Sequence, residues 1–364
     1  MKNAEDFKIL NSYQLSQAIP KAKSYTKMHL SSITMLDDIV NFSNLKELNI
    51  SAMNSLELYE KISVDTLPLV HLENLEKLYI ENDDHISKLY LGRMKKLKSL
   101  FVSSCHTLND IYDLKHLDNL EELIIYDVPN IDKTLLNELV EFVKESVNLR
   151  NVLVDINFFN YFNNKQLKVL KENSVRFVEK LGLYDNYIYS FKMMEDFNKK
   201  VLEIYNFIHD RYKDFDDVLF KEYQFVKNTE YDYEALAKRV DYTENGGKFY
   251  KYCNRYKAIN SSYTTLMKKR AVCEGYVNLL KYFYNLEGVN LYPVTCYYNN
   301  QFHVAAKALI NGVELYFDPE LDNRFNNHNN YGISNAEFLR NHDTCYKRDN
   351  FDRFENINER VREM

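Results

Sequence analysis

The chain of 364 residues contains no tryptophan, only eight glycines and five prolines, and five cysteines. The cysteines are Cys105, Cys253, Cys273, Cys296 and Cys345, and no two of them have C-x-x-C spacing. An odd number without paired spacing argues against a disulfide framework and against a cysteine-based zinc site. We therefore expect free thiols, and we predict neither a metal site nor a cofactor.

A basic excess is also missing. The formal net charge is -6 and the sequence pI is about 5.9, so no excess of positive charge is available to neutralise phosphates. We expect neither nucleic acid nor a membrane surface as a partner. The sequence has no run of 18 apolar residues, and its first residues lack the pattern of a secretory signal. These absences predict a soluble, cytoplasmic protein.

What is present begins with an internal repeat. Six segments carry apolar residues at relative positions 1, 4 and 6, and their starts lie 20 to 30 residues apart; they are 25–36, 45–56, 75–86, 97–108, 120–131 and 149–159. The pattern resembles the leucine-rich repeat, L-x-x-L-x-L followed by an N/C position, which Cys105 and Asn157 occupy. The resemblance implies an α/β leucine-rich repeat solenoid over residues 1–160, with Cys105 packed in its core.

The repeats also predict an outward-facing column. Side chains alternate along a strand, so position 5 points away from the core if positions 4 and 6 point into it. This column reads His29, Asn49, Tyr79, Phe101, Ile124 and Leu153. Its apolar part, from Tyr79 to Leu153, is a candidate docking face for a protein partner or for the rest of the chain. Scattered surface apolar residues are the alternative.

The repeat rhythm stops near residue 161, and we assign residues 161–364 to a second domain with its core at about 190–325. Apolar residues at helical spacing predict helices at 134–147 and 194–212. His209 lies beside the apolar stripe of the second helix and is interpreted as a surface or packed histidine.

Cys273 begins the segment "CEGYVNLLKYFYNLEGV", which has helical spacing and a plausible stop at Gly288. A helix N-terminus favours the thiolate, the reactive form of cysteine. Gly275 would allow close approach of other backbone or of substrate. Cys273 is therefore either a nucleophile or a small core residue.

A hairpin supplies candidate partners for this thiol. Asn311-Gly312 predicts a two-residue loop, so that Ile310 faces Val313 and Ala305 faces Asp318. His303 lies two residues from Ala305 on the same face, within reach of the Asp318 carboxylate. The other face is wholly apolar and is predicted to be the buried one, whereas the His303 face carries the charged side chains.

Thiolate attack on a carbonyl needs a histidine to move protons and a carboxylate to orient the imidazole. The segments "AVCEGYVNLLKYFYNLEGVNLYPVTC" and "FHVAAKALINGVELYFDPELD" resemble the transglutaminase-like superfamily. The resemblance implies a papain-like α+β fold and a triad of Cys273, His303 and Asp318. The backbone N–H of Cys273 would be one oxyanion donor, and Asn260, Ser262 and Tyr263 are candidates for a second. The chain departs from the family pattern at Val304-Ala305 and at Glu320.

The family implies a thiol enzyme acting on a protein or peptide amide bond through a thioester, with hydrolysis favoured over transfer to an amine. The repeats would then recruit a protein partner. The alternative is a catalytically silent binding scaffold whose repeat face is structural or autoinhibitory.

The remaining polar residues suggest no site. Asp318, Glu320 and Asp322 alternate, but the segment lacks the glycine and the final glutamate of an EF-hand loop, so we interpret it as a solvated acidic loop. Cys296 is predicted to be packed in a strand. Cys345, His328 and His342 lie in an asparagine-rich region and are predicted to be exposed.

Overall fold

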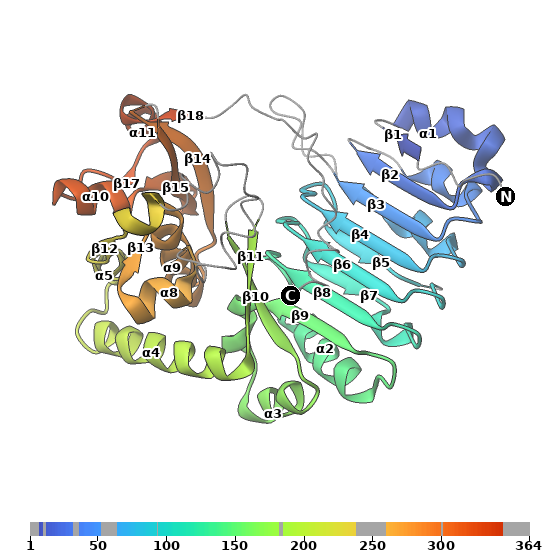
Figure 1. Ribbon diagram of the computed structural model, residues 1–364, viewed down its shortest axis with the longest axis horizontal. Coiled ribbons are helices and arrows are strands. Elements are labelled where there is room, and N and C mark those ends of the chain that lie inside the picture. Colours follow the sequence, from blue (N-terminus) through green and yellow to red (C-terminus); the bar gives the residue numbers. More distant parts are fainter. Residues whose placement is uncertain are drawn as a thin grey trace.

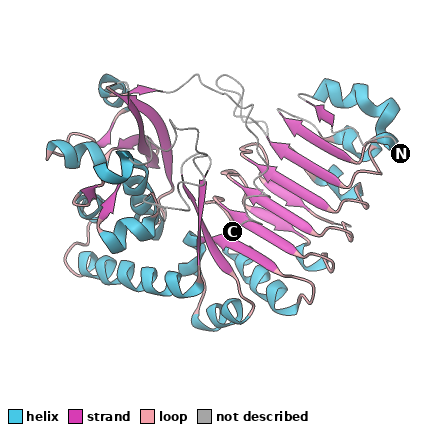
Figure 2. Ribbon diagram, viewed as in Figure 1, coloured by secondary structure: helices cyan, strands magenta, loops and turns pink. Residues whose placement is uncertain are grey.

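The computed structural model describes residues 7–9, 12–31, 36–51, 64–92, 94–181, 185–237, 260–299 and 301–344. Cys253 and Cys345 lie outside these residues. The chain is a mixed α/β protein with two main sheets of nine and five strands (Figures 1 and 2).

The larger sheet is parallel except at one edge. Its strands, in order across the sheet, are β1 (Phe7–Ile9), β2 (Lys27–Ser31), β3 (Glu47–Ser51), β4 (Lys77–Glu81), β6 (Ser99–Ser103), β8 (Glu122–Tyr126), β9 (Asn151–Asp155), β10 (Arg176–Leu181) and β11 (Asp185–Tyr189). Only β10 and β11 pair antiparallel. The sheet thus extends beyond residue 160, where we placed the domain boundary, and that boundary stays a prediction.

The register predicted from the repeats is confirmed. His29, Asn49, Tyr79, Phe101, Ile124 and Leu153 are successive partners across β2, β3, β4, β6, β8 and β9. Residues at relative positions 4 and 6, such as Leu78 and Ile80, are fully buried, because alternation along the strand turns both toward the core. Cys105 is also fully buried, as predicted.

Short elements connect these strands. They are α1 (Ser12–Ala18), η1 (Ile19–Ser24), η2 (Asp37–Asn41), η3 (Leu67–His71), η4 (Leu114–His116), α2 (Lys133–Glu145), η5 (Ile156–Tyr161) and α3 (Asn164–Glu172), together with the two-stranded pair β5 (Lys88–Tyr90) and β7 (Asp110–Tyr112). The helix predicted at 134–147 is α2. Asp132 begins it by accepting a hydrogen bond from the backbone N–H of Thr134.

The second sheet lies in the C-terminal half, in the order β17 (Tyr331–Ile333), β16 (Val313–Phe317), β15 (Gln301–Ile310), β14 (Leu291–Tyr298) and β18 (Asp343–Thr344). The helices of this half are α4 (Phe191–His209), α5 (Phe215–Lys227), α8 (Ser262–Lys268), α9 (Cys273–Leu286), α10 (Pro319–Phe325) and α11 (Asn335–Asn341), with a short parallel pair of β12 (Glu230–Tyr231) and β13 (Arg270–Ala271). Helix α4 is the one predicted at 194–212.

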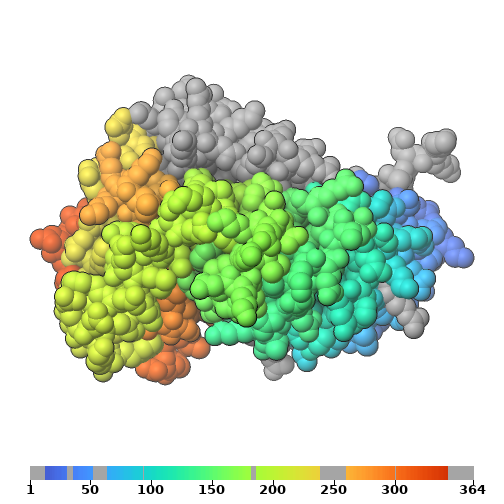
Figure 3. Space-filling view, turned by 90° about the horizontal axis from the view of Figure 1, so that it is seen from below, coloured from blue at the N-terminus to red at the C-terminus, as the bar shows by residue number. Residues whose placement is uncertain are grey.

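One apolar core runs through both halves. The same cluster of buried side chains contains Leu48 and Leu100 of the parallel sheet, Phe197 of α4, and Tyr276 and Leu280 of α9. From below, the surface of α4 continues into that of the parallel-sheet region (Figure 3). Among the described residues, no helix has the length and apolar content needed to cross a bilayer.

The hairpin between β15 and β16 has the predicted register. Ile310 faces Val313 and Ala306 faces Phe317, across Asn311 and Gly312, which both have positive φ. The predicted burial is wrong at Val313 and at several residues of the opposite face, since His303 and Asp318 are buried there as well as Tyr316. Val313 is 56% exposed, whereas Tyr316, on the face that we expected to be charged, is buried. Helix α11 explains the burial of Tyr316, because its Phe338 stacks on Tyr316 at a centroid distance of 4.6 Å.

Candidate functional site

Cys273 is the first residue of α9, as the sequence predicts. It is 7% exposed, and the residue before it, Val272, has an extended backbone and provides no side-chain cap. A backbone N–H at this position has no acceptor one turn earlier within the helix. At its other end, α9 is followed by Gly288, whose positive φ of 76° fits the predicted stop.

Asp318 lies where β16 passes into α10, and its carboxylate is held from several directions. Oδ1 accepts the backbone N–H of Leu321, which makes Asp318 the N-cap of α10. Oδ2 lies 2.6 Å from Nε2 of His303. The predicted proximity of His303 and Asp318 therefore holds, and both side chains are buried.

The Cys273 thiol lies beside this pair, since its charge acts on the His303 ring. Since Nε2 of His303 faces Asp318, Nδ1 is the nitrogen left for the thiol. Burial alone would lower the pKa of His303, but the charge and hydrogen bond of Asp318, with the charge of Cys273, raise it well above its usual value. Imidazole and carboxylate are thus hydrogen-bonded, with the thiol of Cys273 next to them.

His342 is a residue of this site that sequence reasoning missed. We predicted exposure, but His342 is 2% exposed, and its Nε2 lies 2.9 Å from Oδ2 of Asp318. Its ring stacks on Phe338 with a centroid distance of 4.0 Å. Phe338 and His342 are four residues apart at the end of α11, and this i, i+4 spacing was the available signal.

The acidic segment is buried rather than solvated, which corrects the sequence prediction. Asp318, Glu320 and Asp322 are each at most 1% exposed. Glu320 pairs with Arg324 at 2.7 Å, and Asp322 accepts the Tyr223 hydroxyl at 2.6 Å. These partners replace water and allow α10 to bury its first turn.

Glu320 and Tyr231 border the thiol–imidazole pair. Oε2 of Glu320 lies 3.8 Å from Nδ1 of His303, at the position where the chain departs from the family pattern. Burial raises the pKa of Glu320. Burial also raises the pKa of Tyr231, and the charge of Cys273 adds to this effect. Both residues therefore contribute to the electrostatics at the sulfur.

All three candidates for a second oxyanion donor have donor groups that are engaged elsewhere. The N–H and hydroxyl of Ser262 donate to Glu179, and the N–H of Tyr263 donates to the Tyr189 hydroxyl. The side-chain amide of Asn260 donates to Glu274, the residue after Cys273. The second donor therefore stays a prediction, and Asn260 is the candidate that contacts the residue next to Cys273.

The four residues of the predicted docking face are not exposed. Tyr79, Phe101, Ile124 and Leu153 are 1% to 5% exposed and form one apolar cluster. Tyr126, Val178 of β10 and the partly buried Ile188 of β11 pack in the same cluster. The column therefore points away from the main core, as predicted, but its apolar residues are buried in a second cluster and do not form a free surface. Binding of a partner there stays a prediction, and it would require this cluster to be uncovered.

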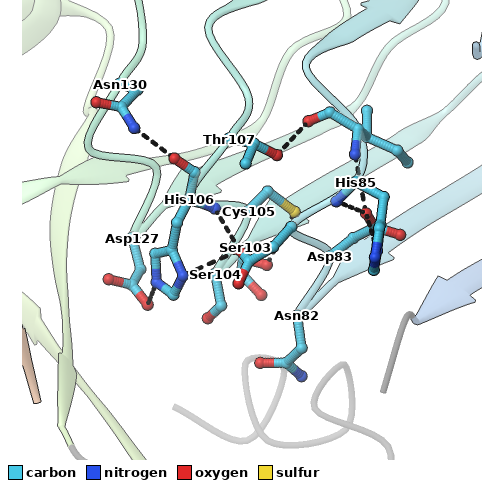
Figure 4. Close-up of polar contacts among 12 residues, drawn as sticks. Asn82, Asp83, His85, Ser103, Ser104, Cys105, His106, Thr107, Asp127 and Asn130 are labelled. Carbon is cyan, nitrogen blue, oxygen red and sulfur yellow. Dashed lines mark hydrogen bonds and ion pairs between the residues drawn. The ribbon is translucent and has the colours of Figure 1, made fainter. Parts of the chain in front are cut away.

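Loops at the carboxyl ends of the parallel strands contact α9 through buried charges. Nζ of Lys281 lies 2.8 Å from Asp127, and Lys180 and His106 also face this carboxylate. Figure 4 shows the His106 ring beside Asp127. Burial would raise the pKa of Asp127, but Lys281, Lys180 and His106 hold it well below its usual range. The helix that begins at Cys273 is thereby tied to the parallel sheet.

Three side chains of the site also have donor atoms suited to a metal ion. His303, Asp318 and His342 each place one such atom within 4.8 Å of the others. His328 is exposed, as predicted, and its Nδ1 lies 3.5 Å from Nζ of Lys227. Cys296 is buried, as predicted.

No protein-family model matches this chain, and no curated protein matches it. Four chains of solved structures match. One of them, described as "Crystal structure of a TGase", is 16% identical, with a TM-score of 0.27. The match covers 51% of this chain and 54% of that chain, so it spans about half of each. A likeness this weak carries no argument about activity.

Proposed function

We propose that the protein is a transglutaminase-like thiol enzyme that acts on an amide bond of a protein or peptide. Cys273 is the nucleophile, His303 the general base and acid, and Asp318 the residue that orients the imidazole. The observation that supports this assignment is the buried 2.6 Å contact between Nε2 of His303 and Asp318, beside Cys273 at the first position of α9.

In the proposed reaction, His303 takes the thiol proton and the Cys273 sulfur attacks the amide carbonyl. The carbon–nitrogen bond then breaks, the proton passes from His303 to the leaving amine, and an acyl thioester remains on Cys273. The backbone N–H of Cys273 would stabilise the oxyanion. Water, activated by His303, hydrolyses the thioester and restores the thiol; an amine in place of water would give transfer. We favour hydrolysis from the family resemblance.

His342 would act as a positioning residue in this scheme. It adds a second donor to Oδ2 of Asp318, alongside His303. Burial would raise the pKa of Asp318, but His303 and His342 lower it, which keeps the carboxylate ionised. A buried acceptor held by three donors has little freedom to turn away from His303.

We also propose that residues 1–160 form a leucine-rich repeat domain, followed by a transglutaminase-like domain over 161–364. The matched parallel register of the repeats supports the first assignment. The burial of Tyr79, Phe101, Ile124 and Leu153 favours the alternative in which the repeat face is structural or autoinhibitory over one in which it is free to recruit a partner.

Alkylation of the intact protein by iodoacetamide at pH 6 tests the nucleophile. We expect Cys273 to react faster than Cys105, because burial raises the pKa of the Cys105 thiol well above its usual value. Asp318→Asn should slow the Cys273 reaction by about 10²-fold or more, since the orienting charge is lost. Mass spectrometry of peptides reports both sites. Equal rates for Cys273 and Cys105, with no effect of Asp318→Asn, would favour the silent scaffold.

A second assay separates hydrolysis from transfer. Glutamine-containing peptides are incubated with the protein and with a fluorescent primary amine, and both ammonia release and amine incorporation are measured. We expect ammonia release that does not need the amine and that disappears in Cys273→Ala. Incorporation without hydrolysis would identify a transferase.

A further inference from the structure

A second cluster of polar side chains lies away from the thiol, where α4, α5 and the end of α9 meet. His209 is the last residue of α4, Glu222 lies on α5, and Glu287 is the C-cap of α9. One donor atom from each lies within 4.8 Å of the other two. Nε2 of His209 is 2.7 Å from Oε1 of Glu287.

The side chain of Glu222 is buried without a group that would compensate the charge of its carboxylate. Its side chain is fully buried, and neither carboxylate oxygen has a hydrogen-bond partner. Its neighbour in the cluster is the carboxylate of Glu287, which has no proton to donate when ionised. Among the described residues, Glu287 forms an ion pair with His209, and no lysine or arginine pairs with either carboxylate. A buried carboxylate without a cation is strongly unfavourable.

We propose that His209, Glu222 and Glu287 bind a divalent transition-metal ion of the zinc class. A dication would satisfy both carboxylates in their ionised form and would take Nε2 of His209 as its third ligand. This site is independent of the proposed thiol chemistry.

The donor set favours zinc and its neighbours over calcium or magnesium. Calcium and magnesium prefer all-oxygen sites, whereas an imidazole with two carboxylates suits zinc, manganese or cobalt. The His209 side chain is 31% exposed and that of Glu287 is 9% exposed, so the cluster opens to solvent on the side away from Glu222. Water can therefore provide a fourth ligand.

Tyr205 supports the orientation of the two outer ligands. Its ring packs on that of His209 at a centroid distance of 4.1 Å. Burial together with the charge of Glu287 raises the pKa of Tyr205 to about 12, so its hydroxyl keeps a proton beside this carboxylate. Polar groups next to a ligating carboxylate are usual around metal sites.

The alternative to a metal ion at this site is a proton held by the carboxyl group of Glu222. Burial, together with the charge of Glu287, raises the pKa of Glu222 to about 9. In the absence of a metal ion, Glu222 would therefore hold a proton near neutral pH, and binding of zinc would release it.

The test is a zinc titration of the intact, chelator-treated protein against a chromophoric competitor. Glu222→Gln keeps the side-chain volume and removes one anionic ligand, and His209→Ala removes the nitrogen ligand. Each should weaken zinc binding by at least about 100-fold, since even outer-shell changes cost 10- to 100-fold. Zinc should raise the Tm of the wild-type protein and leave that of both variants unchanged.

Two controls make the result specific. Glu203→Gln, on the exposed side of α4, should bind zinc as the wild type does. His342→Phe removes a donor of the other cluster and should also keep the zinc affinity. If far-ultraviolet circular dichroism shows that Glu222→Gln folds poorly, the conclusion is drawn from His209→Ala alone. This variant is expected to fold, because His209 is partly exposed at the end of its helix.

The proposal is overturned if Glu222→Gln and His209→Ala bind zinc as tightly as the wild type. It is also overturned if His342→Phe alone abolishes binding, which would assign the ion to Asp318 and its histidines. Calcium binding as tight as that of zinc would contradict the assigned class of ion.

Discussion

At the scale of single residues, Asp318 has the most demanding environment in the candidate site. Its two oxygens accept from Leu321, His303 and His342, while the side chain is fully buried. The hairpin pattern predicts the His303 contact, because register is a local property of Asn311 and Gly312. The His342 contact depends on how α11 packs, and a single sequence does not encode that packing in a readable pattern.

A matched pair of variants tests the role of His342. His342→Phe keeps a ring on Phe338 but removes the donor to Asp318, whereas His342→Gln restores an N–H. We expect His342→Phe to lower the free energy of unfolding by about 1–3 kcal/mol, the usual effect of leaving a buried charged acceptor short of a donor. It should also slow alkylation of Cys273 by about tenfold, the rate equivalent of 1.4 kcal/mol.

His342→Gln should recover a large part of both effects. A purely structural role would lower the stability of both variants and leave the rate of Cys273 alkylation, measured on the folded protein, unchanged. Equal rates in the wild type and in His342→Phe would therefore remove His342 from the proposed site.

At the scale of elements, the contact between α9 and the loops of the parallel strands depends on Asp127. Its carboxylate faces Lys281, Lys180 and His106, and Asp127 itself has a positive φ of 54°. Asp127→Asn removes the charge while keeping a residue type that tolerates this backbone conformation.

We expect Asp127→Asn to lower the free energy of unfolding by about 3 kcal/mol, because two lysines and a histidine lose their buried counter-charge. Urea denaturation followed by circular dichroism measures the change. The matched control is Asp118→Asn in an exposed loop, which should stay within about 0.5 kcal/mol of the wild type.

The contact between His106 and Asp127 predicts that the free energy of unfolding depends on pH. Burial would lower the pKa of His106, but hydrogen bonds and charges from Asp127 and Asp84 raise it to about 9, from 6.5. Because the folded pKa lies above the unfolded one, the protonated ring stabilises the fold fully below about pH 6.5, and this stability is lost as the pH rises through 9.

The measurement is the free energy of unfolding from pH 6 to pH 10 in the wild type and in His106→Gln. We expect the decline between pH 6.5 and 9 to be shallower in the variant. Identical slopes would show that His106 is not protonated in the folded protein at neutral pH.

The elements differ in how well the sequence predicts them. Helix α4 follows from its apolar stripe, and the parallel register follows from repeats with matched apolar positions. The direction of the apolar column was predicted correctly but its burial was not, because strand alternation gives the direction of a side chain and not what packs against it. Val178 and Ile188 come from the β10 and β11 strands, which lack the repeat pattern.

At the scale of the whole molecule, the two sheets share one apolar core and a set of buried polar contacts. Ser262 and Tyr189 both donate to Glu179, and burial raises the pKa of this carboxyl to about 7. Asn160 donates to the Tyr282 hydroxyl at 2.8 Å. Parts joined in this way are expected to unfold together.

We therefore predict one cooperative thermal transition for the intact chain, with coincident curves from far-ultraviolet circular dichroism and from tyrosine fluorescence. The 30 tyrosines and the absence of tryptophan make the fluorescence a report on both halves. Asp127→Asn should shift the entire transition to lower temperature. Two separate transitions, of which the variant moves only one, would contradict this prediction.

Helix α9 is covered on nearly every side. From Cys273 to Tyr284 every residue except Lys281 is buried, whereas α4 keeps an exposed face that includes Leu202 and Phe207. Random substitutions in α4 can therefore fall on positions that contact only water, but in α9 almost every substitution meets packed neighbours. Among homologues, α9 should accordingly diverge much more slowly than α4, along its whole length and not only at Cys273.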